Sequence, residues 1–222
     1  MCSSDLHFVD QVAALAHLAA HTTTLRLGTG IVILPQRNPV VLAKELASID
    51  VLSGGRLEAG FGVGYVPAEF DAVGVPFSER GARMDDHIDA LRAMWRGDLE
   101  FEGPFTSWHG VEAHPRPVGP DGPPIHIGGR SPATFRRAVL RGNGWYGFLT
   151  TLASTEAALG NIQHRLSELE RPPHLGQRSE ERRVGTECRA RWSPDHEKKN
   201  RRRQRTHARR AQQQRRAPLA RA

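Results

Sequence analysis

Cysteine is nearly absent from this chain of 222 residues, which contains only Cys2 and Cys188. The two lie near opposite ends, so a disulfide framework cannot organise the fold. Long apolar runs are missing as well, and none approaches the ~20 residues that a membrane-spanning helix needs. The opening residues Met1–Asp5 are polar and lack the basic start of a secretory signal. We therefore expect a cytoplasmic protein with no membrane association.

Several familiar catalytic motifs are also missing. The sequence has no G-x-x-x-x-G-K-[ST] phosphate loop, and "GFGVGY" does not fit the G-x-G-x-x-G dinucleotide pattern. No G-x-S-x-G nucleophile elbow occurs. His17 and His21 have the spacing of paired zinc ligands, but a leucine follows His17 where a zinc protease carries glutamate. We therefore expect no metal site, and neither P-loop nor triad chemistry.

Positive charge is unevenly distributed along the chain. The formal net charge is +7, yet residues 178–222 alone hold 16 Lys and Arg against 5 Asp and Glu. Residues 1–177 are therefore net acidic. A segment with so few apolar residues cannot bury a core and is typical of a disordered basic arm. Such an arm would bind nucleic acid through phosphate contacts that weaken with salt.

A second interpretation of the ends competes with the basic arm. Residues 178–196 resemble the conceptual translation of a common sequencing adapter, and residues 2–6, "CSSDL", resemble the other adapter end. We therefore expect an artefactual or disordered N-terminus at 1–6, a globular domain at 7–177, and a disordered basic tail at 178–222 that derives from adapter read-through. Nucleic acid is then not an expected partner, although the basic-arm alternative stays open.

Helix-like and strand-like segments alternate four times between these ends. Short apolar runs rich in β-branched residues indicate buried strands, and apolar residues at helical spacing indicate helices. This order predicts parallel strands with right-handed crossovers, and hence an α/β fold. The expected strands are 25–34, 56–65, 124–129 and 144–148; the expected helices are 8–21, 39–53, 78–97, 132–141 and 154–169, with a hairpin-like excursion at 99–124.

The sequence marks some helix ends sharply. Asn38 followed by Pro39 is a good helix start, with Asn as N-cap and Pro in the first helical position. That helix should stop at Gly54-Gly55. Pro132 should open a later helix that Ser131 caps.

Glycine accompanies three of the four predicted strand ends, in "GTGIVILP", "GVGYVPAEF" and "GGRSP". In parallel α/β folds the site lies at the C-terminal ends of the strands. Glycine there would permit close approach of a ligand to the backbone. At "GGRSP", helix N–H groups and Arg130 could bind an anion such as a cofactor phosphate. A plain capped turn explains the same residues equally well.

Charged residues in the long helix predicted at 78–97 have a simpler explanation. Asp85, Asp86 and Asp89 align with Arg92 and Arg96, which predicts a solvated face with ion pairs between successive turns. The remaining histidines of the central region are expected to be structural or exposed: His109, His114 and His126.

Several separate blocks of the sequence resemble one family. The stretch from "LRLGTGIVILP" to "VGVPFSERG" (residues 25–81), followed by "PPIHIGGRSP" and "GNGWYGF", resembles the luciferase-like monooxygenase superfamily over residues 8–170. The chain is most similar to the branch that uses the deazaflavin coenzyme F420, and the FMN-dependent branch is a close second. The resemblance implies a (β/α)8 TIM-type barrel with the cofactor at its C-terminal face.

The resemblance also implies which residues bind the cofactor. Thr29 and Gly30 match the strand end against which the cofactor ring packs, where family members often carry a cis non-prolyl peptide. Gly62, Gly64 and Tyr65 match the next strand end, beside the ring and its chain. The range 128–131 matches the phosphate-binding turn, formed by Gly128, Gly129, Arg130 and Ser131.

The chain departs from the family pattern in its extent. About four of the eight β/α units are visible, so we expect a partial barrel. Catalytic acid and base residues in related enzymes often lie on the N-terminal strands that are missing here, so no catalytic residue is assigned. We expect the chain to be a fragment, inactive by itself, of an enzyme that transfers hydride between F420 and a small organic substrate. An FMN-dependent monooxygenase is the alternative. The full-length parent is expected to be a homodimer.

Overall fold

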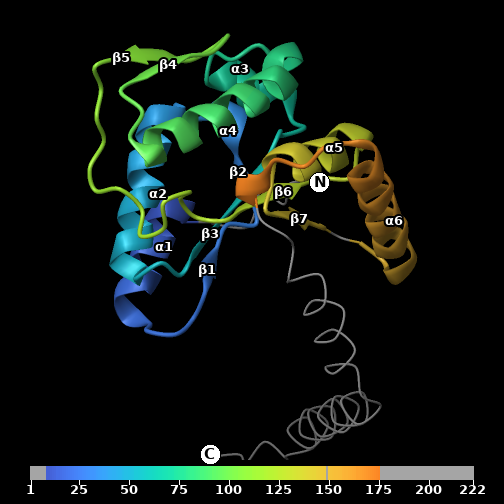
Figure 1. The fold of residues 1–222 in the computed structure, drawn as a ribbon, viewed down its shortest axis with the longest axis horizontal. Helices are drawn as coiled ribbons and strands as arrows, with labels where there is room; N and C mark the ends of the chain where they lie inside the picture. Colours follow the sequence, from blue (N-terminus) through green and yellow to red (C-terminus); the bar gives the residue numbers. More distant parts are fainter. Residues whose placement is uncertain (1–8, 149, 176–222) are drawn as a thin grey trace, which may run out of the picture. The chain divides into compact units, whose positions relative to one another are not determined.

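The computed structural model describes residues 9–148 and 150–175, so the segments predicted as artefactual ends, 1–6 and 178–222, lie outside the described residues. Helices and strands alternate along the described chain, as predicted (Figure 1). The helices are α1 (Gln11–His21), α2 (Pro39–Ser53), α3 (Pro67–Ala72), α4 (Arg80–Arg96), α5 (Pro132–Arg141) and α6 (Leu152–Glu168), with short 3-10 turns η1 (Leu34–Gln36), η2 (Phe77–Glu79) and η3 (Pro173–Leu175). The strands are β1 (Leu27–Gly28), β2 (Val32–Ile33), β3 (Leu57–Gly62), β4 (Glu100–Glu102), β5 (Ser107–His109), β6 (Ile125–Gly128) and β7 (Gly144–Tyr146).

The main sheet is parallel and has the order β1-β3-β6-β7, with β2 also paired to β3. Each step between neighbouring strands is a crossover that contains at least one helix. This arrangement confirms the predicted α/β class, and its four strand positions correspond to part of a barrel wall. The sheet is therefore the scaffold that fixes which loops can share a site.

The first predicted strand, 25–34, is not continuous. It divides into β1 and β2, and the peptide bond between Gly30 and Ile31 in the interval is cis. Leu25, expected to be buried, is 54% exposed. Apolar residues on both sides of "GTG" hid this break, because a run of apolar residues does not report a local change in backbone direction.

Helix α2 begins and ends where its capping residues predict. The Asn38 side chain accepts hydrogen bonds from the backbone N–H groups of Val40 and Val41, so it satisfies donors that the first turn leaves free. Gly54 ends the helix in the left-handed conformation, with φ of 67°, which favours glycine. Local sequence is therefore sufficient to fix the limits of this element.

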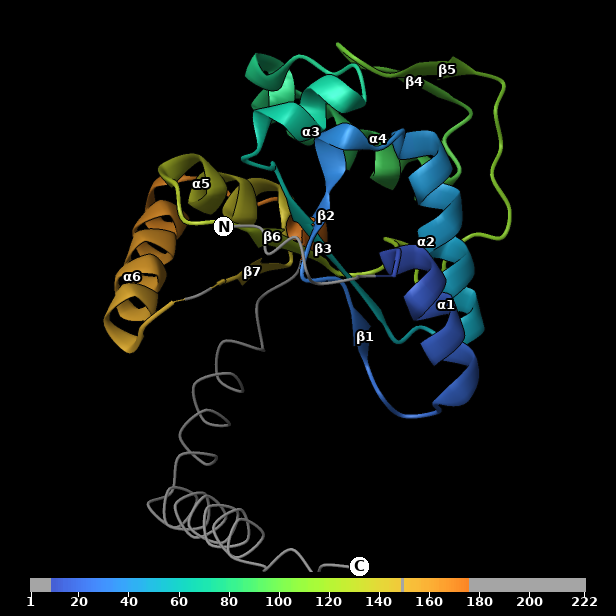
Figure 2. The ribbon, with the colours of Figure 1, turned by 180° about the vertical axis from the view of Figure 1, so that it is seen from behind.

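The main hydrophobic core lies between one face of the sheet and helices α1, α2 and α4. Leu57, Ala59 and Phe61 alternate along β3 and are all 1% exposed or less, so they form the centre of this layer. Helix α1 packs beside α2 in both ribbon views (Figures 1 and 2). It buries Leu15 and Ala19, whereas Leu18 is 40% exposed; Val9, inside the predicted helix range 8–21 but before the observed α1, is 71% exposed. A residue as small as Ala19 faces the core here because α1 packs closely against α2.

The predicted solvated face of α4 is wrong. Asp86 and Arg92 are 5% and 7% exposed, because this helix is covered on more than one side. Asp85 accepts hydrogen bonds from Arg137 of α5, at 2.7 and 3.1 Å. The charges therefore join two helices that are 52 residues apart in sequence, and spacing within one helix gave no signal of this.

The predicted excursion at 99–124 contains the antiparallel hairpin of β4 and β5, as expected. Phe101 and Trp108 stack across it with ring centroids 4.8 Å apart.

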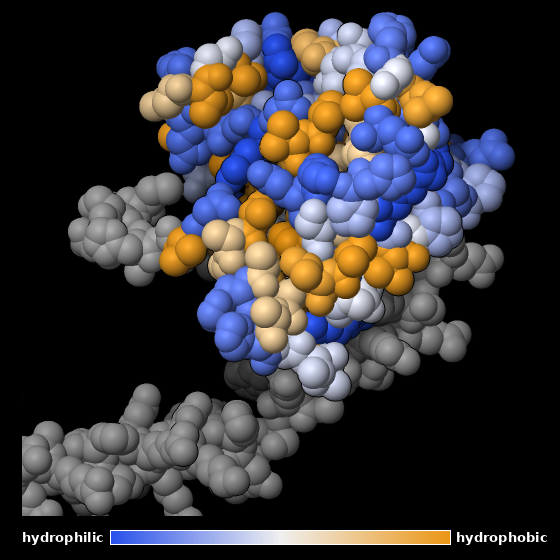
Figure 3. Space-filling model, turned by 90° about the vertical axis from the view of Figure 1, so that its left-hand side faces the viewer, coloured by the Kyte–Doolittle hydropathy of each residue, from blue (hydrophilic) through white to orange (hydrophobic). Residues whose placement is uncertain are grey.

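The space-filling view faces the side that carries α1 and α2, where apolar patches are separated by polar side chains (Figure 3). Among the described helices, none combines the length and apolar character needed to cross a membrane.

Candidate active site at the strand ends

The C-terminal ends of the parallel strands lie along one edge of the sheet. Ile33 pairs with Gly62, Phe61 with Ile127, and Gly128 with Tyr146. The predicted residues after β3 and after β6 therefore lie at neighbouring strand ends. This edge of the sheet, together with the segment that joins β1 to β2, is the strand-end site.

Thr29 lies deeper than a strand end, at the level of Gly60. Its hydroxyl donates to the carbonyl oxygen of Gly60 at 2.8 Å and accepts from the Gly60 N–H at 2.7 Å. The side chain thereby replaces the backbone partners that Gly60 lacks where β1 stops and β2 has not begun. With the hydroxyl engaged twice and the residue 8% exposed, Thr29 shapes the site by holding the Gly30 backbone in place.

Ile31 covers several glycines of the neighbouring strands. A methyl group added to Gly62 would lie 2.4 Å from Ile31 Cδ1, and one added to Gly128 would lie 2.9 Å from Ile31 Cγ2. Gly60 is also required, because a methyl group there would lie 2.0 Å from the carbonyl oxygen of Thr29. These glycines first make room for the protein's own Ile31 and Thr29. Ile31, half-buried, becomes the floor of the site.

Gly64 and Tyr65 follow β3. Gly64 has φ of 75°, and a methyl group there would lie 2.8 Å from both Ile33 Cγ2 and Phe70 Cε2. Only glycine fits this turn without strain. Tyr65 is 78% exposed, so its ring is available on the surface beside the site.

The turn after β6 forms a compact cradle at the start of α5. Gly129 has φ of 127°, and a methyl group there would lie 2.7 Å from Thr134 Oγ1. Ser131 Oγ accepts the N–H of Thr134 at 3.2 Å, which confirms the predicted cap. The first turn of a helix leaves N–H groups without intrahelical acceptors, and the helix dipole adds positive potential. With the exposed guanidinium of Arg130 beside it, this turn can bind an anion.

Tyr146 was missed by sequence reasoning. It ends β7, and its hydroxyl oxygen would lie only 2.7 Å from a methyl group added to Gly30. The neighbouring Trp145 donates its ring N–H to the carbonyl oxygen of Gly129 at 2.7 Å, so β7 also holds the turn after β6 in place. The available signal was position: Tyr146 lies in the fourth predicted strand, 144–148, close to the C-terminal end where the same rule that selected the glycines applied.

A polar group lies on the sheet face opposite the main core. His126 Nε2 of β6 is 2.8 Å from Glu58 Oε2 of β3, and Arg26 forms an ion pair with the same carboxylate. The contact with His126 holds the pKa of Glu58 below its ordinary value, although partial burial acts in the opposite direction. His126 thus pairs with Glu58, and its structural role stays a prediction. In the described part of the chain, no cluster of three or more His, Cys, Asp or Glu could hold a metal ion.

Comparison with known proteins agrees with this geometry. The family model described as luciferase-like monooxygenase matches residues 1–221. The oxygenase component of flavin-dependent trigonelline monooxygenase from Acinetobacter baylyi is 35% identical over 130 residues, covering 58% of this chain and 36% of that protein. An uncharacterized protein from Mycobacterium tuberculosis is 37% identical over 139 residues, covering 62% and 47%. The chain thus spans about half the length, or less, of these curated relatives.

Solved structures show the same likeness. Monooxygenase RslO1 from Streptomyces bottropensis superposes with a TM-score of 0.65 at 29% identity, covering 75% of this chain and 54% of that one. Coenzyme F420-dependent tetrahydromethanopterin reductase from Methanopyrus kandleri gives a TM-score of 0.64 at 23% identity, covering 72% and 50%. The second likeness concerns the fold alone.

Proposed function

Since this chain belongs to the luciferase-like monooxygenase family, whose members here are flavin- or F420-dependent oxidoreductases and monooxygenases, we propose that it supplies the cofactor-holding part of an F420-dependent oxidoreductase. Coenzyme F420 would carry hydride to or from an organic substrate, while the protein supplies position and electrostatics. The observation that carries the proposal is the glycine cradle at the start of α5, next to the apolar floor at Ile31.

The α5 turn suits the phosphate of such a cofactor. Gly129 permits the tight bend and Ser131 caps the helix. The first turn of a helix leaves N–H groups free that a phosphate can accept from. Arg130 can add charge-assisted hydrogen bonds to phosphate oxygens. In this proposal these residues bind the cofactor phosphate and orient the cofactor.

The floor suits the planar ring. The Gly30 backbone is exposed, Ile31 is apolar, and Tyr146 brings a hydroxyl group over Gly30. Gly62 and Gly128 keep the floor low, since any side chain there would collide with Ile31. In this proposal Tyr146 and the Gly30 backbone orient the ring, Tyr65 shields its edge from water, and Gly64 shapes the loop that carries Tyr65.

An FMN-dependent monooxygenase is the second candidate, and a specific observation favours it. Two relatives above 25% identity have names that state an activity; both are monooxygenases, and one is flavin-dependent. A deazaflavin does not readily activate oxygen, whereas FMN does, so the cofactor decides between hydride transfer alone and oxygenation. Both candidates use the same cradle and floor.

The test is direct titration of the full chain with F420 and with FMN, followed by cofactor fluorescence. F420 should bind more tightly than FMN; the reverse preference would overturn the F420 assignment in favour of the FMN-dependent candidate. Arg130→Ala should weaken binding of the preferred cofactor about tenfold or more, the scale for a lost charge-assisted hydrogen bond. Arg165→Ala, on α6, removes the same charge away from the cradle and should leave affinity unchanged. Binding of neither cofactor would overturn the proposal, and equal effects of the two variants would remove Arg130 from the site.

A further inference from the structure

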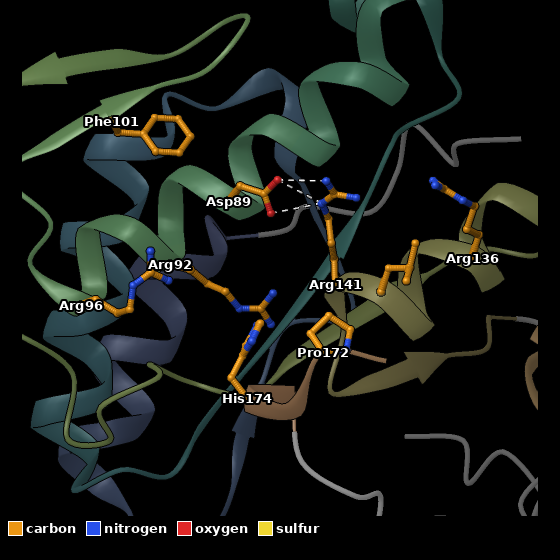
Figure 4. A pocket seen from close by; sticks show the side chains of 9 residues that line it. Asp89, Arg92, Arg96, Phe101, Arg136, Arg141, Pro172 and His174 are labelled. Carbon is orange, nitrogen blue, oxygen red and sulfur yellow. Dashed lines mark hydrogen bonds and ion pairs between the residues drawn. The ribbon is translucent and has the colours of Figure 1, made fainter. Parts of the chain in front are cut away.

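A pocket lies between α4, α5 and the segment around η3. Its volume is about 500 Å³, and Figure 4 shows Arg92 and Arg96 of α4 on one side and Arg141 and Arg136 of α5 on the other. The remaining lining residues are Asp89, Phe101, Leu140, Pro172 and His174. The lining of this pocket therefore includes four arginines and a histidine but only one carboxylate, that of Asp89.

This pocket is separate from the strand-end site. Arg92 and Arg96 lie in the last two turns of α4, and Arg141 is the last residue of α5. Asn143, which contacts Arg92, comes directly before β7. These positions are at the N-terminal ends of the strands, whereas the anion-binding turn at the start of α5 follows the C-terminal end of β6. Nothing proposed for the cofactor uses this pocket.

Two of the four arginines are already paired. Arg141 makes three hydrogen bonds to the carboxylate of Asp89, at 3.0 to 3.1 Å, and Arg96 bonds to Asp98 at 2.5 Å. Both lie in the last turn of a helix, where a cation complements the helix dipole. Ordinary structural roles therefore explain Arg96 and Arg141. They do not explain Arg92.

Arg92 is buried without an adequate partner. It is 7% exposed, and within the described residues its guanidinium makes one hydrogen bond, to Asn143 Oδ1 at 3.4 Å. That oxygen already accepts the N–H of Ile125 at 2.9 Å. Burial lowers the pKa of Arg92 to about 10, with the charges of Asp89 and Asp121 acting against that shift. A buried charge is costly unless it is paired, so the site favours an added anion.

We propose that this pocket binds a multivalent oxyanion of the phosphate class, with Arg92 as its central ligand. A guanidinium offers a planar fork of donors that matches phosphate oxygens, and Arg136 and His174 add positive or donor groups at the rim. Phe101, Leu140 and Pro172 line the same space, so the pocket also accommodates the apolar part of an organic phosphate. Inorganic pyrophosphate is the simplest probe of the shared chemistry.

The experiment must first weaken phosphate binding at the turn before α5, because that turn is the other proposed phosphate site. All variants of the full chain therefore carry Arg130→Met, and binding of pyrophosphate is measured by equilibrium dialysis at constant ionic strength. Adding Arg92→Met should weaken binding at least about tenfold, because the central ligand is lost. Adding Arg37→Met instead, which removes the same charge from an exposed residue of another region, should leave affinity unchanged. Circular dichroism verifies that each variant is folded.

A second variant keeps the test decisive if Arg92→Met does not fold. Leu140→Glu removes no hydrogen bond but places a carboxylate on the wall of the pocket, so it should also abolish pyrophosphate binding. Absence of binding in the Arg130→Met parent would overturn the proposal. Equal affinity before and after Arg92→Met or Leu140→Glu would do the same, as it would assign the anion to another surface. Loss of cofactor binding in Arg130→Met has no bearing on this outcome, which keeps the two proposals separable.

Discussion

Replacing Thr29 with valine tests how the strand-end site is built. Valine has nearly the same shape but no hydroxyl, so both the N–H and the carbonyl of Gly60 would lose partners now held at 2.7 and 2.8 Å. A buried backbone group left unsatisfied costs about 1–3 kcal/mol, so the free energy of unfolding should fall by about 2–6 kcal/mol. Urea denaturation of the full chain, followed by tryptophan fluorescence, measures the change.

Thr29→Ser is the matched control. It keeps the hydroxyl and removes one methyl group, so the expected loss is about 1 kcal/mol. The prediction concerns the order of the two variants: valine, the more apolar, should be the more destabilising at this buried position. If Thr29→Val were as stable as Thr29→Ser, Gly60 would not depend on this side chain. The account of how the chain bridges the interval between β1 and β2 would then be wrong.

Three further substitutions test other parts of the fold. Asn38→Ala removes the cap of α2 and should lower the free energy of unfolding by about 1 kcal/mol, measured by urea denaturation; an unchanged midpoint would contradict the capping role. Glu58 has a lowered pKa in the folded state, so its stabilising contribution is present above its ordinary value of 4.5 and is lost as the pH falls through the lowered folded value. Thermal unfolding should therefore be less sensitive to acid in Glu58→Gln than in the unmodified chain, and parallel pH profiles would refute this. Asp85→Asn leaves the guanidinium of Arg137, 8% exposed, without its anion and should cost about 3 kcal/mol, whereas Asp85→Asn combined with Arg137→Met should recover part of that loss.

Local sequence predicted the elements whose limits depend on nearby residues. Asn38 and Gly54 bound α2, and Ser131 caps α5, because each acts on backbone groups within four residues of itself. The order of strands and helices likewise required parallel pairing. The grouping of the strand ends then followed, since parallel neighbours end at a common edge.

Features that depend on distant contacts were not predictable in the same way. The break between β1 and β2 is bridged by Thr29 and Gly60, which are 31 residues apart. The charges of α4 are satisfied from α5, so a pattern typical of a solvated face marks an interface between helices. Tyr146 of β7 lies beside Gly30, although β7 is separated from β1 in the sheet by β3 and β6. In each case the sequence contained both residues but gave no signal that they are partners.

The size of one aliphatic side chain governs how deep the site is. Ile31 contacts glycines of both β3 and β6. Shortening it to alanine would therefore deepen the site above both strands without altering the backbone beneath. A larger residue at position 31 could not move toward the sheet, because Ile31 is already in contact with the glycines beneath it. In the proposed site, position 31 is therefore the place where exchanging one aliphatic residue would change the room left for a planar ring.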